Sequence, residues 1–182
     1  MQRLPLIALI FVAAALGLLA AGCGSKSPPS TAEWVDGVCS SVVTWKNSLT
    51  SAAQSVQGGN LTQDSLRNAA DDMKSATDTL ESDIKDLGKP ESDTGQQAKD
   101  SVDQLSSELT DGTDSIKSTV DDVSDVSGVV SATASIAATL GTMANQVSST
   151  VKSLQQLDPG GELQTAFNQS SSCQELKTAA SS

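Results

Sequence analysis

Apolar side chains recur at heptad spacing through most of the chain, a pattern typical of helices that bury one face. The first tract opens with a capping box from Ser30 to Glu33, in which each side chain satisfies an unpaired backbone N–H, and it ends at Gly58-Gly59. Its two seams are Val35, Val42, Leu49 and Val56, and Val38, Trp45 and Ala52. The tract predicts one long first helix.

A second helix is expected between Thr62, a suitable N-cap, and Gly88. Glycine relieves the left-handed position that follows a helix, and Pro90 prevents the helix from continuing. The seams of this helix are Leu66, Met73, Leu80 and Leu87, and Ala69 and Ala76, with Ile84 buried in place of Asp83.

Two further apolar tracts follow, and they do not share one heptad phase. The third consists of Ala98, Val102, Leu105, Leu109, Ile116, Val123 and Val126, and the fourth of Ile136, Leu140, Met143, Val147, Leu154 and Leu157. The shift indicates either a stutter within one very long helix or a true break between two helices. Gly128 supplies a natural turn for the second alternative.

The N-terminus has the layout of an export signal. A basic residue, Arg3, precedes an apolar run over 4–21. The last two residues of this run and the two that follow it read Ala20-Ala21-Gly22-Cys23. This tetrapeptide resembles a bacterial lipobox, and the resemblance implies cleavage before Cys23 and a diacylglyceryl group on its sulfur. The alternatives are an uncleaved transmembrane anchor and an ordinary secretory signal. We expect a signal peptide over 1–22 and a lipidated cysteine with its tether over 23–30.

Lipidation of Cys23 leaves Cys39 and Cys173, and two cysteines in an exported chain most simply pair. One helix over about residues 93–157 would be roughly 100 Å long and would carry Cys173 far from Cys39. Four helices running up, down, up and down instead return the chain to its first helix. The disulfide and the phase shift therefore both predict an all-α fold, a coiled-coil-like antiparallel four-helix bundle over 31–178.

A short helical tail is expected after the fourth long helix. Its apolar residues, which we expect to cover one end of the bundle, are Leu163, Ala166 and Phe167. The segment around Cys173 should present the cysteine to the first helix. Residues 179–182 are expected to form a disordered tail.

Composition and charge exclude several functions. The 182 residues include 22 Asp and Glu against 11 Lys and Arg, with no His, no Tyr and 2% aromatic residues. A chain of net charge −11 repels phosphate backbones, so we expect no nucleic-acid partner. Without His, catalysis by imidazole, His-based metal sites and the Glu-x-x-His ligands of di-iron bundles are excluded. We expect no enzyme, no catalytic residues, no cofactor and no metal.

The acidic residues cluster between Asp64 and Asp125, where 17 Asp and Glu accompany 6 Lys and Arg. This stretch predicts a solvated acidic face with pairs along each helix such as Glu81–Lys85 and Asp114–Lys117. A weak cation site and an electrostatic docking surface are the alternatives.

Two tryptophans and the fourth helix are further candidates. Trp45 lies on a seam and is expected in the core, whereas Trp34 lies off the seam and either covers the bundle end near Cys39 or is exposed. Between residues 129 and 157 the only charged residue is Lys152. The fourth helix is therefore either the most buried helix or an exposed neutral face for a partner.

The mature part resembles the small uncharacterised lipoproteins of high-GC Gram-positive (actinobacterial) bacteria in its layout and composition, which implies a location and no activity. We expect an extracytoplasmic lipoprotein, held on the outer face of the cell membrane through Cys23, that presents a helical bundle in a non-enzymatic interaction or envelope role with an unidentified protein partner. The alternative is a tethered binding protein for a small ligand or cation. A cavity above roughly 300 Å³ between the helices would favour that alternative.

Overall fold

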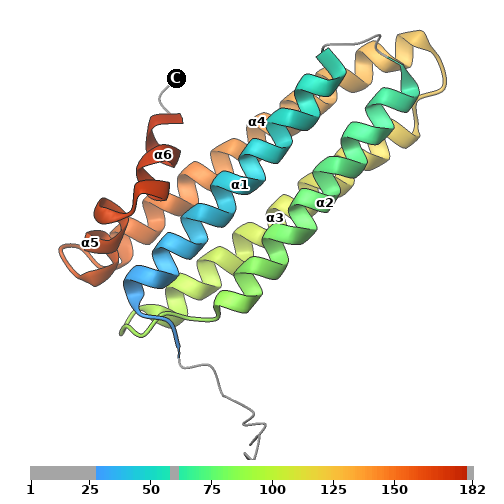
Figure 1. Ribbon diagram of the computed structural model, residues 1–182. Coiled ribbons are helices and arrows are strands. Elements are labelled where there is room, and N and C mark those ends of the chain that lie inside the picture. The colour runs from blue at the N-terminus through green and yellow to red at the C-terminus, as the bar shows by residue number, and fades with distance from the viewer. Residues whose placement is uncertain (1–27, 58–61, 180–182) are drawn as a thin grey trace, which may run out of the picture.

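The computed structural model describes residues 28–57 and 62–179, and these residues form helices without any strand. Four long helices run antiparallel side by side, and two short ones lie at one end (Figure 1). In chain order the helices are α1 (Thr31–Gln57), α2 (Gln63–Leu87), α3 (Gly95–Asp121), α4 (Val126–Leu157), α5 (Glu162–Gln169) and α6 (Ser171–Ala179). The predicted all-α helical bundle is confirmed.

Polar caps begin α1 and α2 where the sequence predicts them. Glu33 Oε2 accepts hydrogen bonds from the Ser30 hydroxyl (2.7 Å) and the Ser30 backbone N–H (3.0 Å), and these bonds lower the pKa of the Glu33 carboxyl. Thr62 Oγ1 accepts from the backbone N–H of Ser65 at the start of α2. At the other end of α2, Gly88 has φ 65°, a backbone conformation that favours glycine.

The break between the third and fourth apolar tracts is real, but Gly128 is not the turn. The chain turns over residues 122–125, and Asp125 is the N-cap of α4, where its carboxylate accepts from the backbone N–H of Gly128 (2.7 Å). Gly128 thus lies in the first turn of α4, and Val126 begins α4 instead of belonging to the third tract. The side-chain cap at Asp125 determines where the helix starts.

The heptad seams form one continuous core. Ile84 is buried in the place that Asp83 leaves on α2, as predicted. At mid-height a polar layer crosses this core: the Trp45 indole N–H on α1 donates to Thr77 Oγ1 on α2 (3.0 Å), and Thr77 Oγ1 lies 2.9 Å from Thr113 Oγ1 on α3. Buried and mutually bonded groups of this kind favour one alignment of the three helices.

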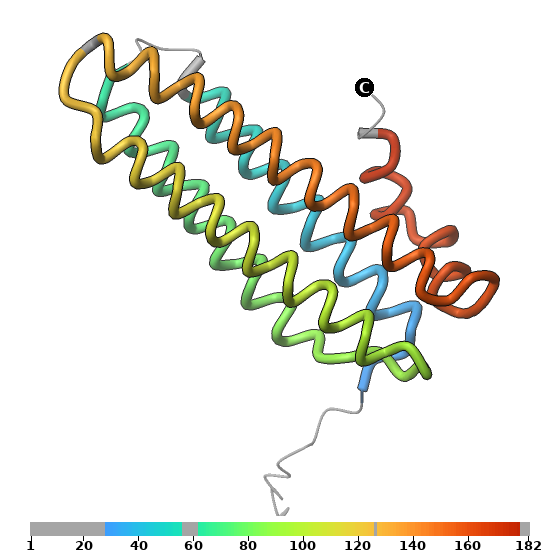
Figure 2. Tube along the Cα trace, turned by 180° about the vertical axis from the view of Figure 1, so that it is seen from behind, coloured from blue at the N-terminus to red at the C-terminus, as the bar shows by residue number. Residues whose placement is uncertain are grey.

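The tail packs against the end of the bundle at which α1 begins and α4 ends (Figure 2). The predicted covering residues Leu163, Ala166 and Phe167 are buried. The predicted pair Cys39 and Cys173 lies at disulfide distance, with the two Cα atoms 5.1 Å apart, and holds α6 against α1.

A candidate ligand groove between α1 and α4

The ring of four long helices is open on one side. The backbone of α1 packs closely against α2, that of α2 against α3, and that of α3 against α4, but α1 and α4 do not close the ring in this way. At one end α5 contacts both α1 and α4, and its Leu163 and Phe167 side chains are fully buried there. α5 therefore occupies part of the space in which α1 and α4 would otherwise meet, and a seam remains open along the rest of their length.

The open seam is a groove of about 730 Å³ that reaches the surface. Its α1 wall includes Val42, Leu49 and Ala53, and its α4 wall includes Leu140, Val147 and Val151. Leu176 of α6 lines the same groove and so joins the walls to the disulfide-linked tail. A concave, mostly apolar space of this size matches the range of about 300–1,000 Å³ that small-molecule sites occupy.

The charged side chains of the groove are all lysines. Lys46, Lys152 and Lys177 line it, and no Asp or Glu is among the described residues that do. The ammonium of Lys177 donates to Asn168 Oδ1 (3.2 Å). Neither Lys46 nor Lys152 forms an ion pair within 28–57 or 62–179. The groove thus combines apolar walls with two lysines, Lys46 and Lys152, that form no ion pair with the described residues.

α4 is an exposed helix, which excludes the interpretation that it is the most buried one. Over much of its length the outward positions are Ala, Ser, Thr, Gly and Asn, and Val130 is 66% exposed. By length and composition alone, the stretch Ser127–Leu157 of this helix is apolar enough to cross a membrane. Its partner along the bundle is α3, which carries six Asp or Glu residues, so α4 packs lengthwise against a strongly acidic neighbour.

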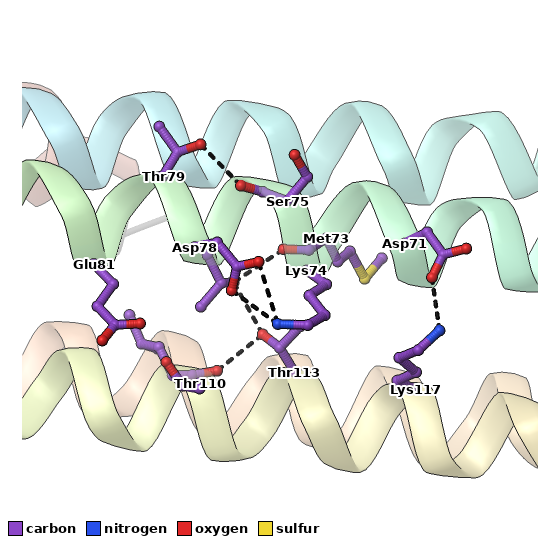
Figure 3. Close-up of polar contacts among 12 residues, drawn as sticks. Asp71, Met73, Lys74, Ser75, Asp78, Thr79, Glu81, Thr110, Thr113 and Lys117 are labelled. Atoms are coloured by element: carbon purple, nitrogen blue, oxygen red, sulfur yellow. Dashed lines mark hydrogen bonds and ion pairs between the residues drawn. The ribbon is translucent and has the colours of Figure 1, made fainter.

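The acidic face lies on α2 and α3, away from the groove. Lys74 pairs with Asp78 along α2, and Lys117 of α3 reaches across to Asp71 of α2 (2.7 Å; Figure 3). The hydrogen bond that each lysine donates to its aspartate raises the pKa of that lysine. The predicted pair of Lys117 with Asp114 is therefore wrong, because the neighbouring helix offers the closer carboxylate.

Other predicted features have structural roles or lie elsewhere. The pair Glu81–Lys85 forms as predicted. Within the described ranges, no group of His, Cys, Asp and Glu side chains could hold a metal ion. Trp34 is buried, and its indole N–H donates to the carbonyl of Gly88 (3.0 Å), so it anchors the start of α1 to the end of α2. Cys23 and the signal segment lie outside the described residues.

The groove itself was not predicted, because heptad seams show which face of a helix is apolar but not which two helices stay apart. One signal was present in the sequence: outside 64–125 the charges balance, with five acidic and five basic residues. No protein-family model, curated protein or solved structure matches the chain.

Proposed function

We propose that the protein is an extracytoplasmic lipoprotein whose bundle binds an apolar ligand in the groove between α1 and α4. The observation that carries this proposal is the groove itself, about 730 Å³ in volume and lined by aliphatic side chains from both helices. Its volume exceeds the roughly 300 Å³ at which ligand binding becomes the favoured alternative. A concave, mostly apolar space between the helices of a bundle, with a few polar side chains at its edge, is the usual form of a small-molecule site.

Binding, and not catalysis, is the chemistry that the groove side chains support. Its polar residues are lysines together with Ser, Thr and Gln, and they include no carboxylate, thiol or imidazole next to a nucleophile. A base paired with a nucleophile is the minimum for covalent catalysis. We therefore propose a non-enzymatic role.

A dye-binding experiment tests the groove. The buried apolar residues of the described ranges lie between Trp34 and Leu176, so a chain that begins at Gly24 keeps all of them. Nile red, a neutral apolar dye, should bind this protein saturably with a rise in fluorescence. Ala144→Phe places a ring in the groove and should weaken dye binding at least about tenfold. Ala138→Phe changes an exposed position of the same helix outside the groove and should have no effect.

Two results would contradict the binding function. One is fluorescence that never saturates, and the other is an equal effect of the substitutions at Ala144 and Ala138. In either case the dye would be reporting general surface hydrophobicity and not the groove.

The membrane anchor is a separate part of the proposal, and it is supported by the sequence Ala20-Ala21-Gly22-Cys23. Two acyl chains on one cysteine give stable membrane attachment, whereas one chain is marginal. Cys23→Ser in the full chain should block lipidation and leave a heavier precursor. Wild-type protein in the medium without lipid mass would contradict the anchor.

An interaction role remains the second candidate, since an amphipathic helix of another protein is the other kind of occupant that an apolar groove between helices takes. The small residues exposed on α4 permit a close approach of such a helix. A photo-crosslinker attached at Ser148, which lines the groove, distinguishes the two candidates in intact cells. An adduct of small-molecule mass supports ligand binding, whereas a protein adduct supports the interaction role.

A further inference from the structure

We infer that the ligand of the α1–α4 groove is an acyl-chain amphiphile with an anionic head, and that the head binds among Lys46, Lys152 and Lys177. The inference depends on the proposed binding function and adds the chemical class of the ligand. Three observations carry it: where charge lies in the molecule, where the lysines lie along the groove, and the length of the apolar remainder.

Charge is separated across the bundle. Of 22 acidic residues, 17 lie between Asp64 and Asp125, a stretch that comprises α2, α3 and their connection. The only charged residue of α4 is Lys152, and α1 has Glu33 and Asp36 in its first two turns with Lys46 beyond them. The groove therefore runs between the two long helices with the fewest acidic residues. On a protein of net charge −11, it is a local site of positive charge.

The lysines gather toward one end of the groove. α1 lines it over 42–54 and α4 over 140–155, and the two helices run antiparallel (Figure 1). Residue 42 is thus level with residues near 155, which places Lys46 and Lys152 at similar heights on opposite walls. At that same end α6 contributes Leu176 and Lys177. Lysines from three helices therefore line this end of the apolar space, with Lys46 and Lys152 on opposite walls.

The remainder of the groove suits a hydrocarbon chain. Leu49 and Ala53 on α1 lie across from Leu140 and Ala144 on α4. From residue 42 to residue 54 the α1 wall is about 18 Å long, at 1.5 Å per residue. A long acyl chain extends over such a distance, and a compact apolar ligand would leave much of the wall uncovered. An acyl chain with its charged head at the lysine end satisfies both parts of the groove.

The sign of the head follows from the lysines. A cationic head would meet like charges without a groove carboxylate to compensate them. A neutral head would leave the Lys46 and Lys152 ammonium groups without an ionic partner. Carboxylates and phosphates bind ammonium through charge-assisted hydrogen bonds, which are stronger than neutral ones. Free fatty acids and phospholipid-type lipids both provide this chemistry.

Competition against bound Nile red tests the head group. Laurate, lauryl alcohol and dodecylamine share one chain length and differ in head charge. Laurate should displace the dye at roughly five- to tenfold lower concentration than the alcohol at low salt, because two to three exposed ion pairs contribute at this level. Dodecylamine should be the weakest competitor. Added salt should reduce the advantage of laurate, since it screens exposed charges.

Matched lysine variants test the position of the head. Lys46→Gln combined with Lys152→Gln should remove the advantage of laurate over lauryl alcohol and leave Nile red affinity unchanged. Lys85→Gln combined with Lys89→Gln removes the same charge at the end of α2, outside the groove, and should retain the advantage. Lysophosphatidylglycerol serves as a second anionic competitor. If lysophosphatidylglycerol displaces the dye at lower concentration than laurate, the head is a phosphodiester. If laurate acts at lower concentration, the head is a carboxylate.

The outcomes separate the two proposals. Saturable dye binding with equal displacement by laurate, the alcohol and the amine would overturn the anionic ligand and leave apolar binding intact. An advantage of laurate that survives the Lys46 and Lys152 substitutions, or that is lost equally in the α2 control, would also overturn it. Absence of saturable dye binding to the unsubstituted protein would instead refute the proposed function.

Discussion

Removal of the Cys39–Cys173 cross-link should destabilise the protein and weaken ligand binding in the groove. The disulfide joins α1 to α6 across 134 residues of sequence. α6 in turn carries Leu176 and Lys177, which line the groove. The substitution Cys39→Ala combined with Cys173→Ala removes the cross-link without leaving a free thiol at either position.

The size of the effect follows from the length of the closed loop. The chain-entropy expression gives about 5 kcal/mol for a loop of this length at 25 °C, which we take as the upper limit. Other contacts hold the tail in place after the bond is lost. The Ser170 hydroxyl donates to Asp36 (2.7 Å), and the Thr31 hydroxyl donates to Glu162 (3.1 Å). We expect a loss of about 2–5 kcal/mol, or roughly 4–20 °C in Tm for a domain of this size.

Thermal unfolding followed by circular dichroism measures the stability, and Nile red titration measures the groove. Both cysteines are fully buried, so the reduced wild-type protein must be prepared by unfolding in reductant and refolding. Reduced wild type provides the control, because it lacks the cross-link but keeps both side chains. It should resemble the double alanine variant in Tm and in dye affinity.

A loss of less than about 1 kcal/mol in the double variant would contradict a stabilising role of the cross-link. The same holds if reduced wild type keeps the stability of the oxidised protein. A fall in stability with constant dye affinity would contradict the expected loss of ligand binding. That result would mean that α6 does not help to form the groove.

Three further predictions concern the buried polar layer, the cap of α1 and the packing of α5, and each has a stability readout. Thr77→Val should lower the free energy of unfolding in urea by about 1–3 kcal/mol, because it leaves the buried Trp45 indole N–H without its acceptor. Thr113→Val should cost less, because Thr113 contacts Thr77 and not the indole. Equal losses would contradict this arrangement of the polar layer. Glu33→Gln should lower Tm at neutral pH, because a carboxylate with a depressed pKa stabilises the fold while it is ionised. The difference in Tm from wild type should vanish as the pH falls through the lowered pKa of Glu33. A difference that persists in acid would contradict this. Phe167→Ala should cost about 3–5 kcal/mol in urea denaturation, whereas Val130→Ala, at an exposed site, should cost under about 0.5 kcal/mol; similar losses would refute the role of α5 in the core.

Local sequence signals predicted much of the fold. The capping residues Ser30 and Thr62 begin helices, and Gly88 ends one, because each acts through backbone groups within four positions of itself. The pairing of Cys39 with Cys173 could be predicted because the expected lipidation of Cys23 leaves only two of the three cysteines for a long-range pair. Both kinds of inference require little knowledge of which helices are neighbours.

The predictions that were wrong involve choices among competing partners. Lys117 has Asp114 within its own helix, but Asp71 of α2 lies closer once α2 and α3 pack together. The sequence predicts the α3–α4 turn at Gly128, but the side-chain cap at Asp125 determines where α4 begins. The open seam could not be predicted for a similar reason. The heptad patterns of α1 and α4 are equally compatible with a closed bundle, in which these two helices would be each other's partners.

The tail explains why this bundle differs from a closed ring. In a closed ring the apolar faces of α1 and α4 would cover each other along their length. Here α5 buries Leu163 and Phe167 against the ends of these two helices, and the Cys39–Cys173 link keeps α6 beside α1. Part of the apolar surface of α1 and α4 is then left for another occupant. The groove that remains is concave and mostly apolar, as small-molecule sites between bundle helices are, and its lysine-lined end distinguishes it from the acidic face of α2 and α3.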